Sequence, residues 1–212
     1  MKIQATLQKL IVEFLGATLI MIAVAGSLVH VTTMSQLAAA ATIGLAILVT
    51  TPVSGGHLNP AVSLFYYSRK VLSLSEFLLY SASQIAGGVL GTVIGLQLWN
   101  KAVQPLQLGT PPSLPILLGE WVATGGLVFL YGYLGSLKKN NLIAVSVAVW
   151  IFSIGTLSQS GAEANPAISL ALIAAGQSVA ITGWLIIAQL VGMLSGVLGL
   201  MVFTAKAVKK RG

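Results

Sequence analysis

Two asparagines, Asn59 and Asn165, occupy the same local pattern 106 residues apart, which is half the length of this 212-residue chain. Residues 54–64 and 160–170 are identical at seven of eleven positions, and in both stretches the asparagine is followed by Pro-Ala. Asparagine is a preferred helix cap and proline is preferred at the first helical position, so each stretch predicts a loop that enters a short helix. If the side-chain oxygen caps that helix, the NH2 group is left as a hydrogen-bond donor.

The loops before the two asparagines supply matching acceptors, because backbone carbonyl groups of residues 55–58 and 161–164 can line a path beside the amides. A track with donors at its centre and acceptors on both approaches suits molecules that donate and accept hydrogen bonds, such as water, glycerol, urea and ammonia. One Asn-Pro-Ala alone would be an ordinary helix cap, but two matched copies favour a pore. The loop residues expected to line it are Gly55, Gly56, His57, Gly161 and Ala162.

Glu13 and Glu120 stand at matching places in two apolar stretches. A carboxylate at membrane depth is costly, and such residues are functional candidates. A proton relay is one interpretation. We favour the other, in which each carboxylate accepts hydrogen bonds from loop N–H groups and holds a short helix in place. His57 and Glu163 each precede an asparagine by two positions, and either could face the pore or brace its loop.

Other kinds of chemistry are not predicted. The chain has no cysteine, and its two histidines, His30 and His57, have no plausible third ligand, so we expect no metal site. No set of nucleophile, base and acid suggests an enzyme, and no cofactor is expected. The net charge of +7 reflects the scarcity of acids rather than a basic surface, so nucleic acid is not an expected partner.

The elements that position these residues are membrane helices. The chain is 56% hydrophobic and 7% charged, with a mean hydropathy of +0.94, whereas soluble domains carry about 25% charged residues. A spanning helix needs roughly 20 apolar residues. Six candidates are expected at about 7–29, 35–53, 74–98, 115–136, 141–158 and 178–205. Residues 59–68 and 165–174 are long enough for only half a span at ~1.5 Å per residue.

Basic residues set the expected orientation. If six spans alternate, ten of the eleven lysines and arginines fall on one side, and only Lys101 falls on the other. Positive charge marks the cytoplasmic side, so we expect a multi-pass protein of the cell membrane with both termini inside. Arg69 and Lys70 directly follow the first half-helix, so this segment is expected to enter the membrane from the cytoplasm and return to it. The second half-helix is expected to enter from outside.

The repeat covers the whole chain, which we predict to be a single membrane channel domain, 1–212. Residues 1–104 and 113–212 form its two halves, and Gln-x2-Gly-x3-Gly at 84–91 recurs at 189–196. Three spans per half make the repeat inverted, with the functional site near the midplane. The half-helices would meet there with their N-termini, each carrying roughly +0.5 of an elementary charge, which would repel cations.

These motifs resemble the aquaporin and glycerol-facilitator family, the major intrinsic proteins. The resemblance is found in residues 54–63, the second Asn-Pro-Ala at 165–167, Glu13-Phe14-x-Gly16 and the Gln-x2-Gly-x3-Gly pair. The resemblance implies an all-α integral membrane fold, with six transmembrane helices and two re-entrant half-helices in a right-handed bundle. It also implies a homotetramer in the lipid bilayer with one pore per subunit, and passive transport without a cofactor.

One position departs from the family pattern. Most members have an arginine after the second Asn-Pro-Ala, and here that residue is Ile168. Matched by spacing, the other filter positions are Ser153, Ala162 and either Ala39 or Ile43. Such a filter lacks its fixed charge and would be wider. Glycerol facilitators usually carry aspartate at the next position, which is Ser169 here, so the solute stays undecided.

Three hypotheses follow. The first is a passive channel for water and small neutral solutes, with ions excluded by the paired half-helices. The second is a channel mainly for another uncharged solute: glycerol, urea, ammonia or a metalloid acid. The third is a non-conducting member of the family with a structural or adhesion role, because small aliphatic filter residues are compatible with a pore that dewets.

Overall fold

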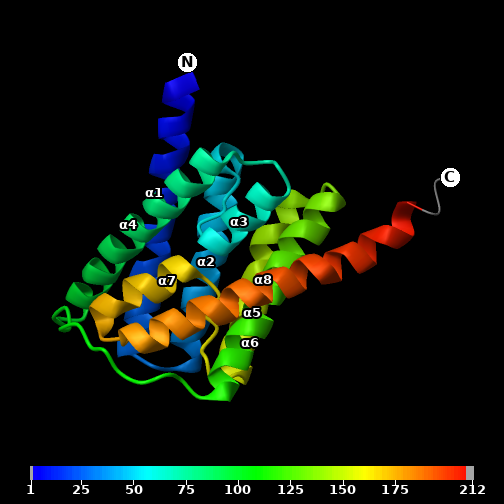
Figure 1. Cartoon of the computed structure of the whole chain (residues 1–212). Coiled ribbons are helices and arrows are strands. Elements are labelled where there is room, and N and C mark those ends of the chain that lie inside the picture. Colours follow the sequence, from blue (N-terminus) through cyan, green and yellow to red (C-terminus); the bar gives the residue numbers. More distant parts are fainter. Residues whose placement is uncertain (1, 209–212) are drawn as a thin grey trace.

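The computed structural model describes residues 2–208, with the side chains of residues 4–204 (Figure 1). Of the basic residues used for the expected orientation, residues 209–211 therefore lie outside the described residues. Within these described residues, six helices are long and apolar enough to cross a membrane, as predicted. They are α1 (Lys2–Val29), α2 (Thr33–Ser54), α4 (Leu74–Leu98), α5 (Leu114–Ser136), α6 (Ile143–Leu157) and α8 (Val179–Val208).

Two short helices complete the fold and match the predicted half-spans. These are α3 (Pro60–Ser68) and α7 (Pro166–Ala171), and α7 continues as a 3-10 turn, Leu172–Ala175. Each begins as its sequence predicts: Asn59 accepts a hydrogen bond from the Ala61 amide at 2.8 Å, and Asn165 accepts one from the Ala167 amide at 2.9 Å. Proline follows each cap, where its missing N–H is not needed.

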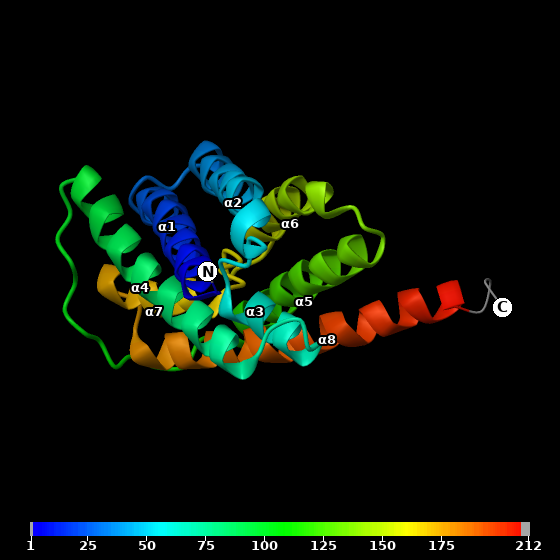
Figure 2. The ribbon, with the colours of Figure 1, turned by 90° about the horizontal axis from the view of Figure 1, so that it is seen from above.

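The long helices pack in matched pairs, α1 against α4 and α5 against α8, while α2 packs against α6 (Figure 2). The repeated glycines permit this approach. A Cβ atom added at Gly87 of α4 would lie 2.1 Å from the Phe14 carbonyl oxygen, and one at Gly192 of α8 would lie 2.4 Å from that of Trp121. The two pairs therefore bring backbone against backbone at equivalent places, which small residues allow.

The two short helices contact each other, and both also contact α4 and α8. The connection from α4 to α5 crosses to the end of α7 and the start of α8. The Gln104 amide donates to the Ala174 carbonyl at 3.0 Å, and the Val179 amide donates to the Gln107 carbonyl at 2.8 Å. This extended, proline-containing segment thus ties the second half-helix to its neighbours.

Candidate pore

The two loops meet through a reciprocal pair of hydrogen bonds. The Asn59 side-chain amide donates to the Ala164 carbonyl at 2.8 Å, and the Asn165 amide donates to the Leu58 carbonyl at 2.9 Å. An asparagine amide has two N–H donors, so each keeps one for the space beside it. Both asparagines are nearly buried, at 4% and 6% exposed. The sequence predicted the caps but not this cross-bridge.

Both loops hold a non-glycine residue in the left-handed backbone region directly before the asparagine. Leu58 has φ 50° and Ala164 has φ 49°. Side-chain-bearing residues rarely adopt this conformation, so the surroundings must hold it. The conformation turns the carbonyl groups of these residues toward the opposing asparagines, which accounts for the reciprocal pairing.

Glu13 holds the first loop from behind. Its fully buried carboxylate accepts from the Leu58 amide at 2.6 Å, from the His57 amide at 3.1 Å and from the Ser54 hydroxyl at 2.5 Å. The Gln84 side chain donates to it at 2.7 Å. The carboxylate therefore satisfies two loop N–H groups that no regular secondary structure pairs.

Glu120 makes the equivalent contacts to the second loop. It accepts from the Glu163 amide at 2.9 Å and from the Ala164 amide at 2.8 Å, and Gln189 donates to it at 2.7 Å. The two glutamines of the Gln-x2-Gly-x3-Gly repeat thus bind the two acids. Their recurrence in the sequence was the available signal for this contact, but it indicated only an internal repeat.

His57 and Glu163 occupy equivalent places and differ in their surroundings. The His57 ring is 5% exposed, stacks on Tyr66 with ring centroids 4.5 Å apart, and lies 3.2 Å from the Ser63 hydroxyl. The Glu163 carboxylate accepts from the Ser169 hydroxyl, and the residue is partly exposed. The second loop therefore places a second acid close to Glu120, where the first loop has a histidine.

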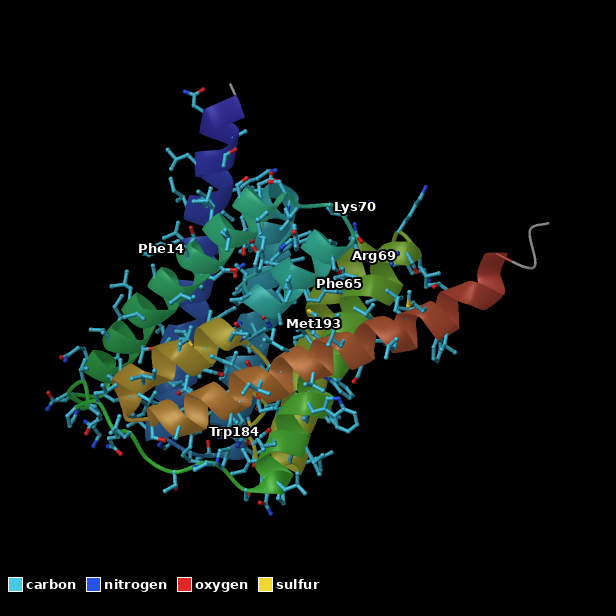
Figure 3. All side chains as sticks on the ribbon, in the orientation of Figure 1. Phe14, Phe65, Arg69, Lys70, Trp184 and Met193 are labelled. Carbon is cyan, nitrogen blue, oxygen red and sulfur yellow. The ribbon has the colours of Figure 1, made fainter. Side chains whose placement is uncertain are left out.

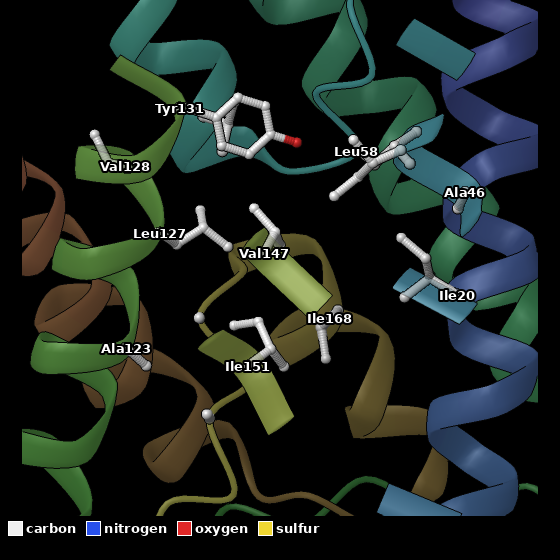
Figure 4. Packing of buried hydrophobic residues seen from close by; sticks show 14 of the residues in the cluster. Ile20, Ala46, Leu58, Ala123, Leu127, Val128, Tyr131, Val147, Ile151 and Ile168 are labelled. Carbon is white, nitrogen blue, oxygen red and sulfur yellow. The ribbon is translucent and has the colours of Figure 1, made fainter. Parts of the chain in front are cut away.

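A small central cavity of about 20 Å³ lies beside the asparagine bridge, which is room for about one water molecule. Its polar lining includes His57, Asn59, Glu163 and Asn165, and the rest is largely aliphatic. Figure 4 shows side chains of α5, α6 and α7 directed into this region, among them Leu127, Tyr131, Val147, Ile151 and Ile168. Tyr131 was not predicted from the sequence; its hydroxyl donates to the Gly56 carbonyl at 2.7 Å.

A second, wider cavity of about 490 Å³, the vestibule, lies on the side of the 160–164 loop. Gly161 and Ala162 line it, as does Ala39. Ile43 and Ile168 line both cavities. Of the two second-span positions left open by the spacing, Ile43 is thus the one that lies between the cavities, and Ala39 lies only in the vestibule.

Three of the expected residues lie elsewhere. Ser153 is in the described lining of neither cavity, and its hydroxyl donates to the Val149 carbonyl at 2.8 Å. α6 contributes Ile151 to both cavities, and Ser153, two residues on, is rotated about 200° around the helix. Gly55 and Gly56 also lie outside the described lining of these two cavities.

Six spanning helices and two half-helices joined at their N-termini beside a cavity define a helical membrane channel. The sequence pattern of the major intrinsic proteins matches residues 1–116. An aquaglyceroporin of Toxoplasma gondii is 30% identical over 207 residues, covering 92% of this chain and 76% of the relative. The aquaglyceroporin AqpS of Rhizobium meliloti is 28% identical, covering 77% of this chain and 74% of the relative.

A solved structure agrees. The X-ray structure of the aquaglyceroporin from Plasmodium falciparum has a TM-score of 0.69 and 19% sequence identity, covering 96% of this chain and 97% of that one. This likeness shows the fold. The chain belongs to the major intrinsic protein family, and it is a passive channel for water and small solutes.

Proposed function

We propose that the conducting path runs past the paired amides of Asn59 and Asn165 and admits only uncharged molecules. The reciprocal bridge between the two loops carries this proposal, because it fixes both helix caps beside the central cavity. The N-termini of α3 and α7 face this point, and their partial positive charges oppose cations. Glu13 and Glu120 act as supports of the half-helices, and the chain is not an enzyme.

Stopped-flow light scattering tests the path. Proteoliposomes in a sucrose gradient should shrink faster than empty vesicles, and a pH-sensitive dye inside should report no added proton flux. Water flux no faster than in empty vesicles would overturn the conducting path. It would favour the second candidate, a non-conducting structural member, for which the narrow and largely aliphatic central cavity is the supporting observation.

In this proposal Ile168, together with Ile43 and Ala162 around the vestibule, sets the size of the solutes that can pass. All three side chains are apolar, so the pore has no fixed positive charge at Ile168 to exclude larger solutes. Placing a guanidinium there by Ile168→Arg should lower glycerol or urea flux about tenfold and water flux less, since an arginine narrows the opening and interacts with polar solutes. An equal loss of both fluxes would contradict this assignment.

The orientation and assembly are also part of the proposal. Arg69 and Lys70 lie after α3, toward the same end as the α5–α6 connection with Lys138 and Lys139 (Figure 3). All four are exposed, and positive charge favours the cytoplasmic side. The halves 1–104 and 113–212 form an inverted repeat, and the chain assembles as a homotetramer in the cell membrane with both termini inside. Cross-linking of purified protein tests the tetramer.

A further inference from the structure

The central cavity and the vestibule share four lining residues: Ile43, Ile151, Ile168 and Glu163. A solute that moves between the two cavities therefore passes three aliphatic side chains and one acid. Aliphatic walls cannot replace the water that a polar solute gives up on entry, and an unpaired polar group in such a place is costly. Of these four residues, Glu163 has the side chain that can replace the hydrogen bonds a solute loses when it gives up water.

The position of Glu163 is fixed from two sides. Its backbone amide donates to Glu120 at 2.9 Å, and its carboxylate accepts from Ser169, whose hydroxyl in turn accepts from Gln189 at 2.9 Å. Ser169 is fully buried. The amide of Gln177, a vestibule residue, is a further donor to the carboxylate.

These contacts leave part of the carboxylate unused. A carboxylate has about four acceptor sites, and the two protein donors fill two of them. Glu163 remains partly exposed and lines both cavities, so the other sites are available to a molecule in the path. The equivalent His57 lines only the central cavity, and its ring is 5% exposed and stacked on Tyr66.

We propose that Glu163 determines the solute preference of the pore. Its carboxylate accepts hydrogen bonds from N–H and O–H groups as these lose water between the three isoleucines. The pore thereby favours small, donor-rich neutral solutes, amides first, relative to water. This inference rests on the conducting path proposed above and adds the residue that selects within it.

The test compares urea flux with water flux in proteoliposomes of the wild type, Glu163→Gln and Glu163→Leu. Glutamine keeps one side-chain oxygen as an acceptor and loses the other, so the urea-to-water ratio should fall about threefold. Leucine removes the acceptor, and the ratio should fall about tenfold. The matched control is Glu76→Gln, which removes a carboxylate at the start of α4, where it bonds Ser73 on the surface; its ratio should not change.

The outcomes separate the two proposals. If wild-type vesicles conduct no more water than empty vesicles, the conducting path fails. If water flows and Glu163→Gln leaves the ratio unchanged, the role of Glu163 is wrong and the path stands. If both fluxes fall by the same factor in the Gln and Leu variants, Glu163 only supports its loop, which also overturns its role in selection.

Discussion

The first re-entrant loop is held from behind by an acid, a glutamine and a serine, and the second loop is held by the same three residue types. Glu13, Gln84 and Ser63 form one set, with 2.7 Å and 3.0 Å between the glutamine and its two partners. Glu120, Gln189 and Ser169 form the other, at 2.7 Å and 2.9 Å. The residue beyond the serine differs between the sets, being His57 in the first and Glu163 in the second.

This difference separates support from selection. The support must be present twice, because each half-helix starts inside the protein with loop N–H groups that need acceptors. The side chain two positions before each asparagine is not bound by that requirement, since its backbone amide makes the supporting bond. The molecule can therefore keep a covered aromatic ring on one side and an accessible acid on the other.

The largest expected effect is removal of the supports. Glu13→Ala and Glu120→Ala each leave two buried loop amides without acceptors, and each such group costs about 1–3 kcal/mol, so unfolding free energy should fall by about 4 kcal/mol. The two losses should be similar, because the serine at the equivalent position of each loop, Ser54 or Ser160, also bonds the carboxylate. Thermal unfolding in detergent measures both. Loss of stability in only one of the two variants would show that the two carboxylates do not play equivalent roles.

A smaller effect is expected at the helix contacts. Gly87→Ala and Gly192→Ala place a Cβ against a backbone carbonyl, 2.1 Å and 2.4 Å away, and overpacking of this kind costs about 1–3 kcal/mol. The control is Gly183→Ala, also in α8, whose added Cβ meets nothing within 4 Å. Alanine there should be neutral or stabilising by up to about 1 kcal/mol. Equal melting temperatures for all three would contradict the close packing.

The asparagine bridge comes next. Asn59→Ala and Asn165→Ala each remove a cap, worth about 1 kcal/mol, and one bridging hydrogen bond of similar size, for a total of about 2 kcal/mol. The double variant should cost less than the sum, because both bridges belong to one contact between the loops. Full additivity in thermal unfolding would show that the two bridges are independent.

The sequence predicted the parts of this architecture that depend on local pattern. Apolar length gave the six spans, and Asn-Pro-Ala gave the start of both half-helices, because caps and prolines act within a single turn. The short motif that begins at Gln84 and recurs at Gln189 indicated the internal repeat. Each of these features follows from residues close together in the chain.

Which helix side chains point into the cavities was harder to predict. Counting back from Asn165 selected Ser153, but the structure places Ile151 in the lining of both cavities. The rotation of α6 depends on its packing against α2 and α5, which no local pattern encodes. Two further contacts also depend on the tertiary structure. Tyr131 bonds Gly56, 75 positions away, and each asparagine donates to a carbonyl group of the other loop, more than 100 positions away.

The smallest effect tests the difference between His57 and Glu163. Ser63→Ala removes a hydroxyl that meets His57 at 3.2 Å, while Ser169→Ala removes one that donates to the Glu163 carboxylate. A typical hydrogen bond contributes about 0.5–1.5 kcal/mol, and at 3.2 Å the contact of Ser63 with His57 is long for one made by a hydroxyl group. Ser169→Ala should therefore lower the unfolding free energy by about 1 kcal/mol more than Ser63→Ala. Thermal unfolding of the two variants side by side measures the difference, and a larger loss for Ser63→Ala would show that Glu163 is held by other contacts.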